Sequence, residues 1–184
     1  MVTSIQDPIA LLRQMERASM ERAPGLPEET KGPVLWTGVG FRLGDVHLVT
    51  PLGHITEVLP CPVITPVPRT KSWTKGIANV RGNLLTIVDL AEFFGKEPIF
   101  ANEEARLMVM NVEGLNAALL VNEVLGLRHF DEELERQDTS VLDDPVVPHL
   151  QGAFLRDNVL WGVFDMHSLT DSGAFMHVAA ETHG

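Results

Sequence analysis

The chain opens with a helical pattern and changes to a strand pattern near Trp36. Asp7 precedes Pro8, which is the usual order of a helix N-cap and a first helical residue. Apolar side chains then recur three to four positions apart, and the Pro- and Gly-containing segment "RAPGLPEETKGP" follows. Residues 1–35 are therefore predicted to form one short amphipathic helix and a linker.

From Trp36 onward, short apolar runs alternate with two-residue connections that contain Gly, Asn or Asp. These residue types tolerate the positive φ angle that a tight hairpin turn requires. Turns of this kind are predicted at Gly44-Asp45, Gly82-Asn83, Glu113-Gly114 and Asp157-Asn158. Because the runs between the turns are rich in Val, Leu, Ile and Phe, the pattern predicts a mainly β domain over residues 36–170, followed by a C-terminal tail over residues 171–184.

Two short helices are expected to interrupt the strands, after "IVD" and after "VFD". Asp89 and Asp165 are the predicted N-caps, because a short carboxylate can accept a hydrogen bond from a free N–H group of the first helical turn. Gly95 is expected to end the first of these helices, since glycine is favoured just past a helix C-terminus.

The second half of the strand region repeats the first in outline. "GIANVRGNLLTIVDL" (Gly76–Leu90) resembles "GAFLRDNVLWGVFDM" (Gly152–Met166), and each has an Arg before its predicted turn. "TEVL" likewise resembles "NEVL" further along the chain. A degenerate repeat predicts two similar small β subdomains. The acidic segment Asp131–His149 is the predicted insertion, expected to be a solvated loop with at most a helical turn.

Composition narrows the classes of partner and compartment. The chain has 184 residues and a formal charge of −11, which argues against nucleic acid and anionic membrane surfaces as partners. Cys61 is the one cysteine, so an internal disulfide is excluded. The N-terminus has no secretory signal pattern, and no long apolar window predicts direct membrane insertion. A cytoplasmic protein is expected.

The sequence shows no recognisable catalytic or metal-binding pattern. Its seven histidines do not form H-x-x-x-H or H-E-x-x-H pairs, so only long-range contacts could build a metal site. No G-x-S-x-G motif is present. The glycine-rich "GVGFRLG" leads into a strand rather than a helix, so it lacks the helix N-terminus that binds phosphate. We therefore expect no enzyme activity, no metal and no cofactor.

Two opposite charges stand among apolar positions of predicted strands: Glu57 in "HITEVL" and Arg81 in "GIANVRG". A buried charge without a partner is costly, so the two are expected to pair. Strand alternation places Arg81 on the same face as Ile77 and Asn79. Two interpretations stay open: an ion pair that fixes strand register, or the polar centre of a face that receives a partner.

Four stretches, in this order, resemble the CheW-like domain of chemotaxis scaffold proteins: "FRLGDVHLVTPLGHITEVL", "PRTKSWTKGIANVRGNLLTIVDL", "RLMVMNVEGLNAALLVNEVLGL" and "LQGAFLRDNVLWGVFDM". The most specific part is the N-x-R-G turn followed by apolar pairs and D-L. "WTGVGFRLG" and "SWTKGIANVRGNLL" are most similar to the adaptors of type IV pilus, twitching-motility chemosensory systems. Asn122 departs from the family, which usually has Asp there.

The resemblance implies two small five-stranded β-barrels packed around a shared core, with no catalytic activity. It implies a scaffold that couples the cytoplasmic tip of a methyl-accepting chemoreceptor to the regulatory domain of a CheA-type histidine kinase, at receptor arrays of the inner membrane. Glu57 and Arg81 match residues that pair across neighbouring strands in the family. The positions matching its receptor-binding side are Ile55, Gly76, Val124 and Leu127.

Three alternatives to a pilus-pathway adaptor remain. The chain could be an adaptor of a flagellar chemotaxis pathway, because the two pathways differ only in weak motifs. It could be a ligand-binding β-barrel, although no convergent set of catalytic or metal-binding residues supports this. It could also be a separate piece of a kinase regulatory domain, although its own N-terminal helix argues for a protein that acts alone.

Overall fold

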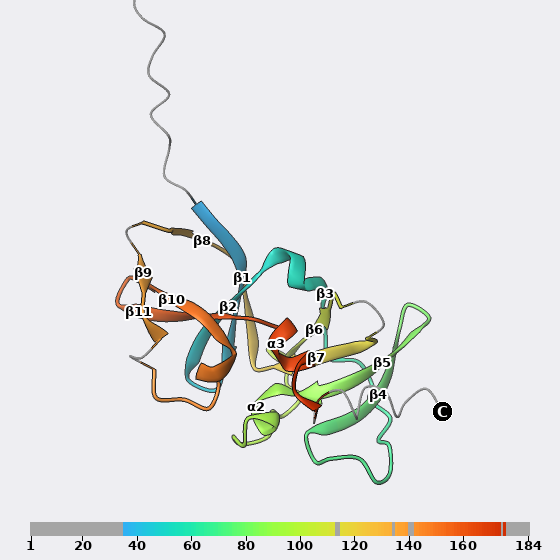
Figure 1. The fold of residues 1–184 in the computed structure, drawn as a ribbon. Helices are drawn as coiled ribbons and strands as arrows, with labels where there is room; N and C mark the ends of the chain where they lie inside the picture. The colour runs from blue at the N-terminus through green and yellow to red at the C-terminus, as the bar shows by residue number, and fades with distance from the viewer. Residues whose placement is uncertain (1–34, 113–114, 134, 140–141, 174, 176–184) are drawn as a thin grey trace, which may run out of the picture. The chain divides into compact units, whose positions relative to one another are not determined.

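A computed structural model describes residues 35–112, 115–133, 135–139, 142–173 and 175. The predicted N-terminal helix, the predicted Glu113-Gly114 turn and most of the predicted tail lie outside the described residues. Strands dominate the described part of the chain and form two sheets, with only short helices between them (Figure 1). The predicted mainly β fold is therefore confirmed.

The sheets have six and five strands. The first, sheet A, has in spatial order β8 (Glu123–Asp131), β1 (Leu35–Leu43), β2 (Val46–Pro51), β11 (Val159–Phe164), β10 (Leu150–Arg156) and β9 (Arg136–Gln137). The second, sheet B, has β3 (Ile55–Pro60), β6 (Arg106–Met110), β7 (Ala117–Val121), β5 (Asn83–Asp89) and β4 (Thr74–Val80). The short helices are η1 (Leu52–His54), α2 (Leu90–Phe93), η3 (Val147–His149) and α3 (His167–Thr170).

The two sheets share one strand layout. In sheet A the β1–β2 hairpin lies between the edge strand β8 and the β10–β11 hairpin, and in sheet B the β6–β7 hairpin lies between the edge strand β3 and the β4–β5 hairpin. In each sheet one parallel pair joins the two hairpins, β2 with β11 and β7 with β5. The strand that follows each central hairpin crosses to the other sheet as its edge. The repeat in the sequence is thus a repeat of strand layout.

The two sheets correspond to the two expected β-barrel subdomains, but they are open sheets rather than closed barrels. In the described strands, neither sheet closes by a ladder between its first and last strand. Sheet A also gains a sixth strand, because the segment predicted as an acidic loop pairs with β10 through Arg136 and Gln137. In sheet B, the chain after β3 reaches β4 at a single bridge, where Thr65 and Ile77 exchange backbone hydrogen bonds of 2.8 and 2.9 Å.

One apolar core spans both sheets. It joins side chains of sheet A, including Phe41, Leu43 and Leu48, to side chains of sheet B, including Ile87 and Leu107. A second and smaller cluster lies within sheet A and consists of Val49, Phe130, Phe154, Trp161 and Val163. Because strands with two apolar faces can pack on both sides, the continuous apolar runs of the sequence fit a core shared by the two sheets.

Two of the predicted turns are confirmed, at Gly44-Asp45 and at Asp157-Asn158. The turn between β4 and β5 was predicted one residue too late. It consists of Arg81 and Gly82, whose φ angles of 52° and 91° are the positive values that a two-residue hairpin turn requires. The Asn79 side chain accepts a hydrogen bond of 2.8 Å from the Gly82 backbone and helps to hold this turn.

The first short helix begins and ends as predicted. Asp89 caps α2, because its Oδ1 accepts a hydrogen bond of 3.1 Å from the Glu92 backbone N–H. Gly95 follows with a φ of 73°, a conformation that glycine adopts without strain. The second helix, α3, starts one residue later than expected. Its cap position is Met166, and Asp165 instead accepts a hydrogen bond from the His167 backbone at 2.9 Å.

Candidate functional site

The centre of the candidate site is the ion pair between Glu57 and Arg81. Glu57 lies on the edge strand β3, and its Oε1 is 2.7 Å from Nη2 of Arg81. The Arg81 side chain is 79% exposed and the Glu57 side chain 27% exposed. Strong screening by water therefore limits the contribution of this pair to stability.

The pair joins opposite edges of sheet B, rather than neighbouring strands as the resemblance implied. β3 and β4 are the first and last strands of that sheet, and three strands lie between them. Arg81 reaches Glu57 because it belongs to the β4–β5 turn instead of a strand face. The contact shows that sheet B curls until its edges meet, so the ion pair and the Thr65–Ile77 bridge take the place of a closing ladder.

The other four predicted site residues are divided between the sheets. Ile55 is half-buried at the start of β3, and Val124 is half-buried on β8. Leu127, also on β8, is 56% exposed. Gly76 is buried on β4 with a φ of 137°, and an added Cβ there would lie 2.1 Å from the Thr65 carbonyl oxygen. The absence of a side chain at Gly76 therefore allows the segment at Thr65 to pass directly over β4.

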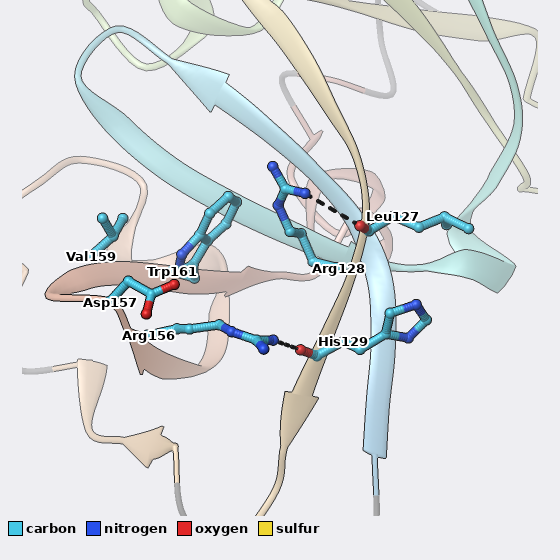
Figure 2. Close-up of a pocket in the computed structure, with 7 residues that line it drawn as sticks. All are labelled: Leu127, Arg128, His129, Arg156, Asp157, Val159 and Trp161. Atoms are coloured by element: carbon cyan, nitrogen blue, oxygen red, sulfur yellow. Dashed lines mark hydrogen bonds between the residues drawn. The ribbon is translucent and has the colours of Figure 1, made fainter.

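A second feature, which the sequence did not indicate, is a pocket of about 360 Å³ between β8 and the β10–β11 hairpin. Its lining residues are Leu127, Arg128, His129, Arg156, Asp157, Val159 and Trp161. Figure 2 shows the side chains of Arg128, Arg156 and Trp161 on one side of β8, and those of Leu127 and His129 on the other. We call it the gap pocket. The one available signal was Arg156, which the repeat singles out as a lone charge beside a turn.

The repeat had matched Arg156 with Arg81, but the structure separates their positions. β10 ends at Arg156 and its turn follows, whereas Arg81 is itself the first turn residue. Arg156 thus occupies the strand position that Val80 has in sheet B. From this strand position the Arg156 guanidinium lies over the ring of Phe130, 6.0 Å from its centroid, while the side chain stays 46% exposed.

Three histidines that are scattered in the sequence meet around Asp165. The rings of His54 and His167 are 4.3 Å apart, and Nδ1 of His54 is 3.7 Å from Oδ1 of Asp165. Burial lowers the pKa of His54, the nearby His167 lowers it further, and Asp165 partly offsets both. Burial also lowers the pKa of His149, again against the opposing effect of Asp165. Among the described residues, no group of side chains is arranged to hold a metal ion.

Lys75 on β4 lies 3.3 Å from the buried carboxylate of Asp89 and 2.5 Å from that of Glu92, which ties α2 to the sheet. Burial raises the pKa of the Cys61 thiol, so this cysteine has little reactive thiolate. Within the described residues, no helix is long and apolar enough to cross a membrane.

Comparisons with known proteins find a matching family and similar proteins over most of the chain. The model of the CheW-like domain matches residues 37–174. Protein PilI of Pseudomonas aeruginosa is 35% identical, in an alignment that covers 97% of this chain and 99% of PilI. Protein FrzA of Myxococcus xanthus is 36% identical over 48% of this chain and 55% of its own length. The crystal structure of the scaffolding protein TtCheW from Thermoanaerobacter tengcongensis is similar with a TM-score of 0.64 and 23% identity, covering 75% of this chain and 94% of that one.

Proposed function

The chain belongs to the CheW-like domain family, and from this premise we propose that it is a non-enzymatic adaptor of a type IV pilus chemosensory pathway. In this role it couples a methyl-accepting chemoreceptor to a CheA-type histidine kinase. The observation behind the choice of pathway is the similarity to PilI, which extends over almost the full length of both chains. The similarities to FrzA and to the CheW of Helicobacter pylori cover only about half of this chain.

An adaptor must hold two partners at once, which requires two separate surfaces. We assign the receptor tip to the surface that contains Glu57 and Arg81, together with Ile55 on β3 and Val124 and Leu127 on β8. Leu127, whose side chain is 56% exposed, would supply buried apolar area on binding. Gly76 contributes indirectly, by allowing the Thr65 segment to pass close to β4.

The kinase regulatory domain, which has the same fold in this family, takes a different surface. Transient signalling interfaces are small, on the order of 1,000 Å². We expect micromolar affinity between the chain and the kinase, with only a modest dependence on salt because apolar contacts dominate. A salt titration of the complex tests this: nanomolar affinity that is lost at moderate salt would instead indicate a charge-driven partner of this acidic chain.

Reconstitution tests the proposed function. The purified full chain is mixed with the kinase and with a cytoplasmic receptor fragment, and kinase autophosphorylation is followed. The chain should change the rate only when the receptor fragment is present, and kinase with receptor alone is the control. An equal effect without receptor would contradict coupling, and ATP hydrolysis by the chain itself would contradict a non-enzymatic role.

A binding experiment distinguishes the pilus pathway from the flagellar pathway. A pull-down of the chain against the kinase of the pilus pathway and the kinase of the flagellar pathway should retain the pilus kinase preferentially. Preferential retention of the flagellar kinase would reassign the chain to flagellar chemotaxis and leave the adaptor role intact.

A further inference from the structure

The gap pocket lies where sheet A fails to close. β8 is the first strand of that sheet, and the tip of the β10–β11 hairpin faces it across the pocket (Figure 2). The short strand β9 pairs with β10 at Ala153 and Phe154, and the Leu155 backbone donates a hydrogen bond to the Glu135 carbonyl just before β9. Beyond Leu155, no described strand covers the tip of the hairpin. At about 360 Å³, the pocket is near the lower end of the size range of ligand sites and suits one or two side chains.

Arg128 is held in this pocket by packing rather than by a counter-charge. Its guanidinium lies over the indole of Trp161, 5.4 Å from the ring centroid. Gly40 on β1 makes this packing possible, because an added Cβ would lie 2.9 Å from both the Arg128 side chain and the Trp161 ring. Among the described residues, no carboxylate lies within 4 Å of the Arg128 guanidinium. Its one hydrogen bond, to the Leu127 carbonyl, is a long 3.5 Å.

Arg156 leaves part of its hydrogen-bonding capacity unused. Its Nη1 donates to the backbone carbonyl of His129, and its Nε is 3.6 Å from Oε1 of Glu135. A guanidinium has five N–H donors, so donors remain for another acceptor. Two arginines and a single carboxylate, that of Asp157, line this pocket, in a chain whose formal charge is −11. In sheet B, the corresponding approach of hairpin and edge strand is completed by the carboxylate of Glu57.

We propose that the gap pocket receives a carboxylate side chain of the chemoreceptor tip, bound between Arg128 and Arg156 with Trp161 as the apolar wall. This inference rests on the proposed function. The location favours the receptor as the partner, because Leu127 of the proposed receptor surface and Arg128 of the pocket are neighbours on the edge strand β8. Side chains alternate along a strand, so the two lie on opposite sides of β8. A receptor tip that lies along this strand edge would therefore contact both. A planar guanidinium matches a carboxylate in shape as well as charge.

Receptor binding by charge variants of the full chain tests the proposal. Arg128→Glu should weaken affinity for the cytoplasmic receptor fragment about tenfold or more, and Arg128→Gln by less, because only the first change adds repulsion. Lys71→Glu is the matched control. It makes the same change of charge at an exposed residue before β4, outside the pocket, and should change affinity less than about twofold. Thermal melting shows whether each variant is folded.

A direct readout is the NMR signal of the Trp161 indole N–H, which is assigned by its loss in the variant Trp161→Phe. The signal should shift when the receptor fragment is added, and the shift should be lost when the contacting Asp or Glu of the receptor is changed to Arg. That receptor variant should bind Arg128→Glu better than it binds the wild-type chain. Wild-type affinity in Arg128→Glu together with an unmoved Trp161 signal would overturn this inference and leave the adaptor role intact. No binding of the wild-type chain to the receptor would instead overturn both.

Discussion

The β4–β5 and β10–β11 hairpins have the same place in their sheets but use arginine differently. Arg81 stands in the turn of the first hairpin and forms an exposed ion pair with Glu57 on β3. Arg156 stands at the end of a strand, where it packs over Phe130 and binds the backbone of β8. A shift of one residue relative to the turn thus changes the contact of the arginine from a carboxylate to an aromatic ring and a backbone carbonyl, while its side chain stays 46% exposed. We infer that the first arginine contributes little to stability, whereas the second both supports the fold and keeps donors for a ligand.

The glycines that open these hairpins differ in the same way. Gly76 and Gly152 both lie at a break in the register of their hairpin, so the repeat gives them one position. Gly76 has a φ of 137° and lies directly beneath the Thr65 backbone. For Gly152, an added Cβ would meet only the end of the Arg136 side chain, at 3.9 Å. Glycine is therefore required at this position of sheet B, where the edges meet, and is dispensable at the corresponding position, Gly152, of sheet A.

The largest effect is expected from alanine at these two glycines. Gly76→Ala should cost about 3 kcal/mol or more, because the Thr65 backbone must move and the φ angle disfavours any side chain. Gly152→Ala should change stability by about 0.5 kcal/mol or less. Urea unfolding monitored by tryptophan fluorescence measures both. Equal costs at the two positions would mean that the two hairpins are not distinguished by how their sheets close.

A smaller difference is expected between the two arginines. Arg156→Ala should cost about 1–2 kcal/mol, because it removes a charged hydrogen bond to a backbone carbonyl and a contact with Phe130. Arg81→Ala should cost about 1 kcal/mol or less, since the pair with Glu57 is exposed to water. The melting temperature of Arg81→Ala should therefore fall by only a few degrees. A larger loss for Arg81→Ala than for Arg156→Ala would reverse the comparison.

The smallest effect concerns pH and the histidines near Asp165. The folded-state pKa values of His54 and His149 are lowered from the ordinary 6.5, mainly by burial. As pH falls through about 6.5, the unfolded chain takes up protons that the folded chain resists, so the free energy of unfolding decreases. The decrease ends below the folded-state pKa values. The double variant His54→Gln, His149→Gln should flatten this slope in urea unfolding at several pH values, and an unchanged slope would contradict the assignment.

Local rules predicted much of this fold, and non-local contacts account for most of what they missed. Asp89 as a cap, Gly95 as a helix end and the Asp157-Asn158 turn each depend on a few neighbouring residues. The strand β9 was missed because Arg136 and Gln137 look like loop until β10 offers them a partner. The β4–β5 turn was placed one residue late because Gly-Asn is the commoner turn pair, whereas Arg81 accepts a positive φ here.

For the candidate site, the sequence predicted the ion pair between Glu57 and Arg81 but not its place in the sheet. The cost of lone charges suggested that Glu57 and Arg81 would pair, and the structure places them 2.7 Å apart. Their position at opposite edges of a curled sheet depends on the order of all five strands, which no local pattern encodes. The gap pocket was missed for the same reason, since Arg128 and Trp161 meet only through the packing of β8, β1 and β11 around Gly40.

Receptor-dependent kinase autophosphorylation with Arg81→Ala tests most directly whether the Glu57–Arg81 surface couples receptor to kinase. The variant should melt within a few degrees of the wild-type chain and still bind the kinase, but it should lose most of the receptor-dependent change in rate. The charge swap Glu57→Arg, Arg81→Glu separates fold from function, because it should restore stability without restoring coupling. Full coupling by folded Arg81→Ala, or recovery of stability and coupling together in the swap, would show that the pair is purely structural and would contradict this account.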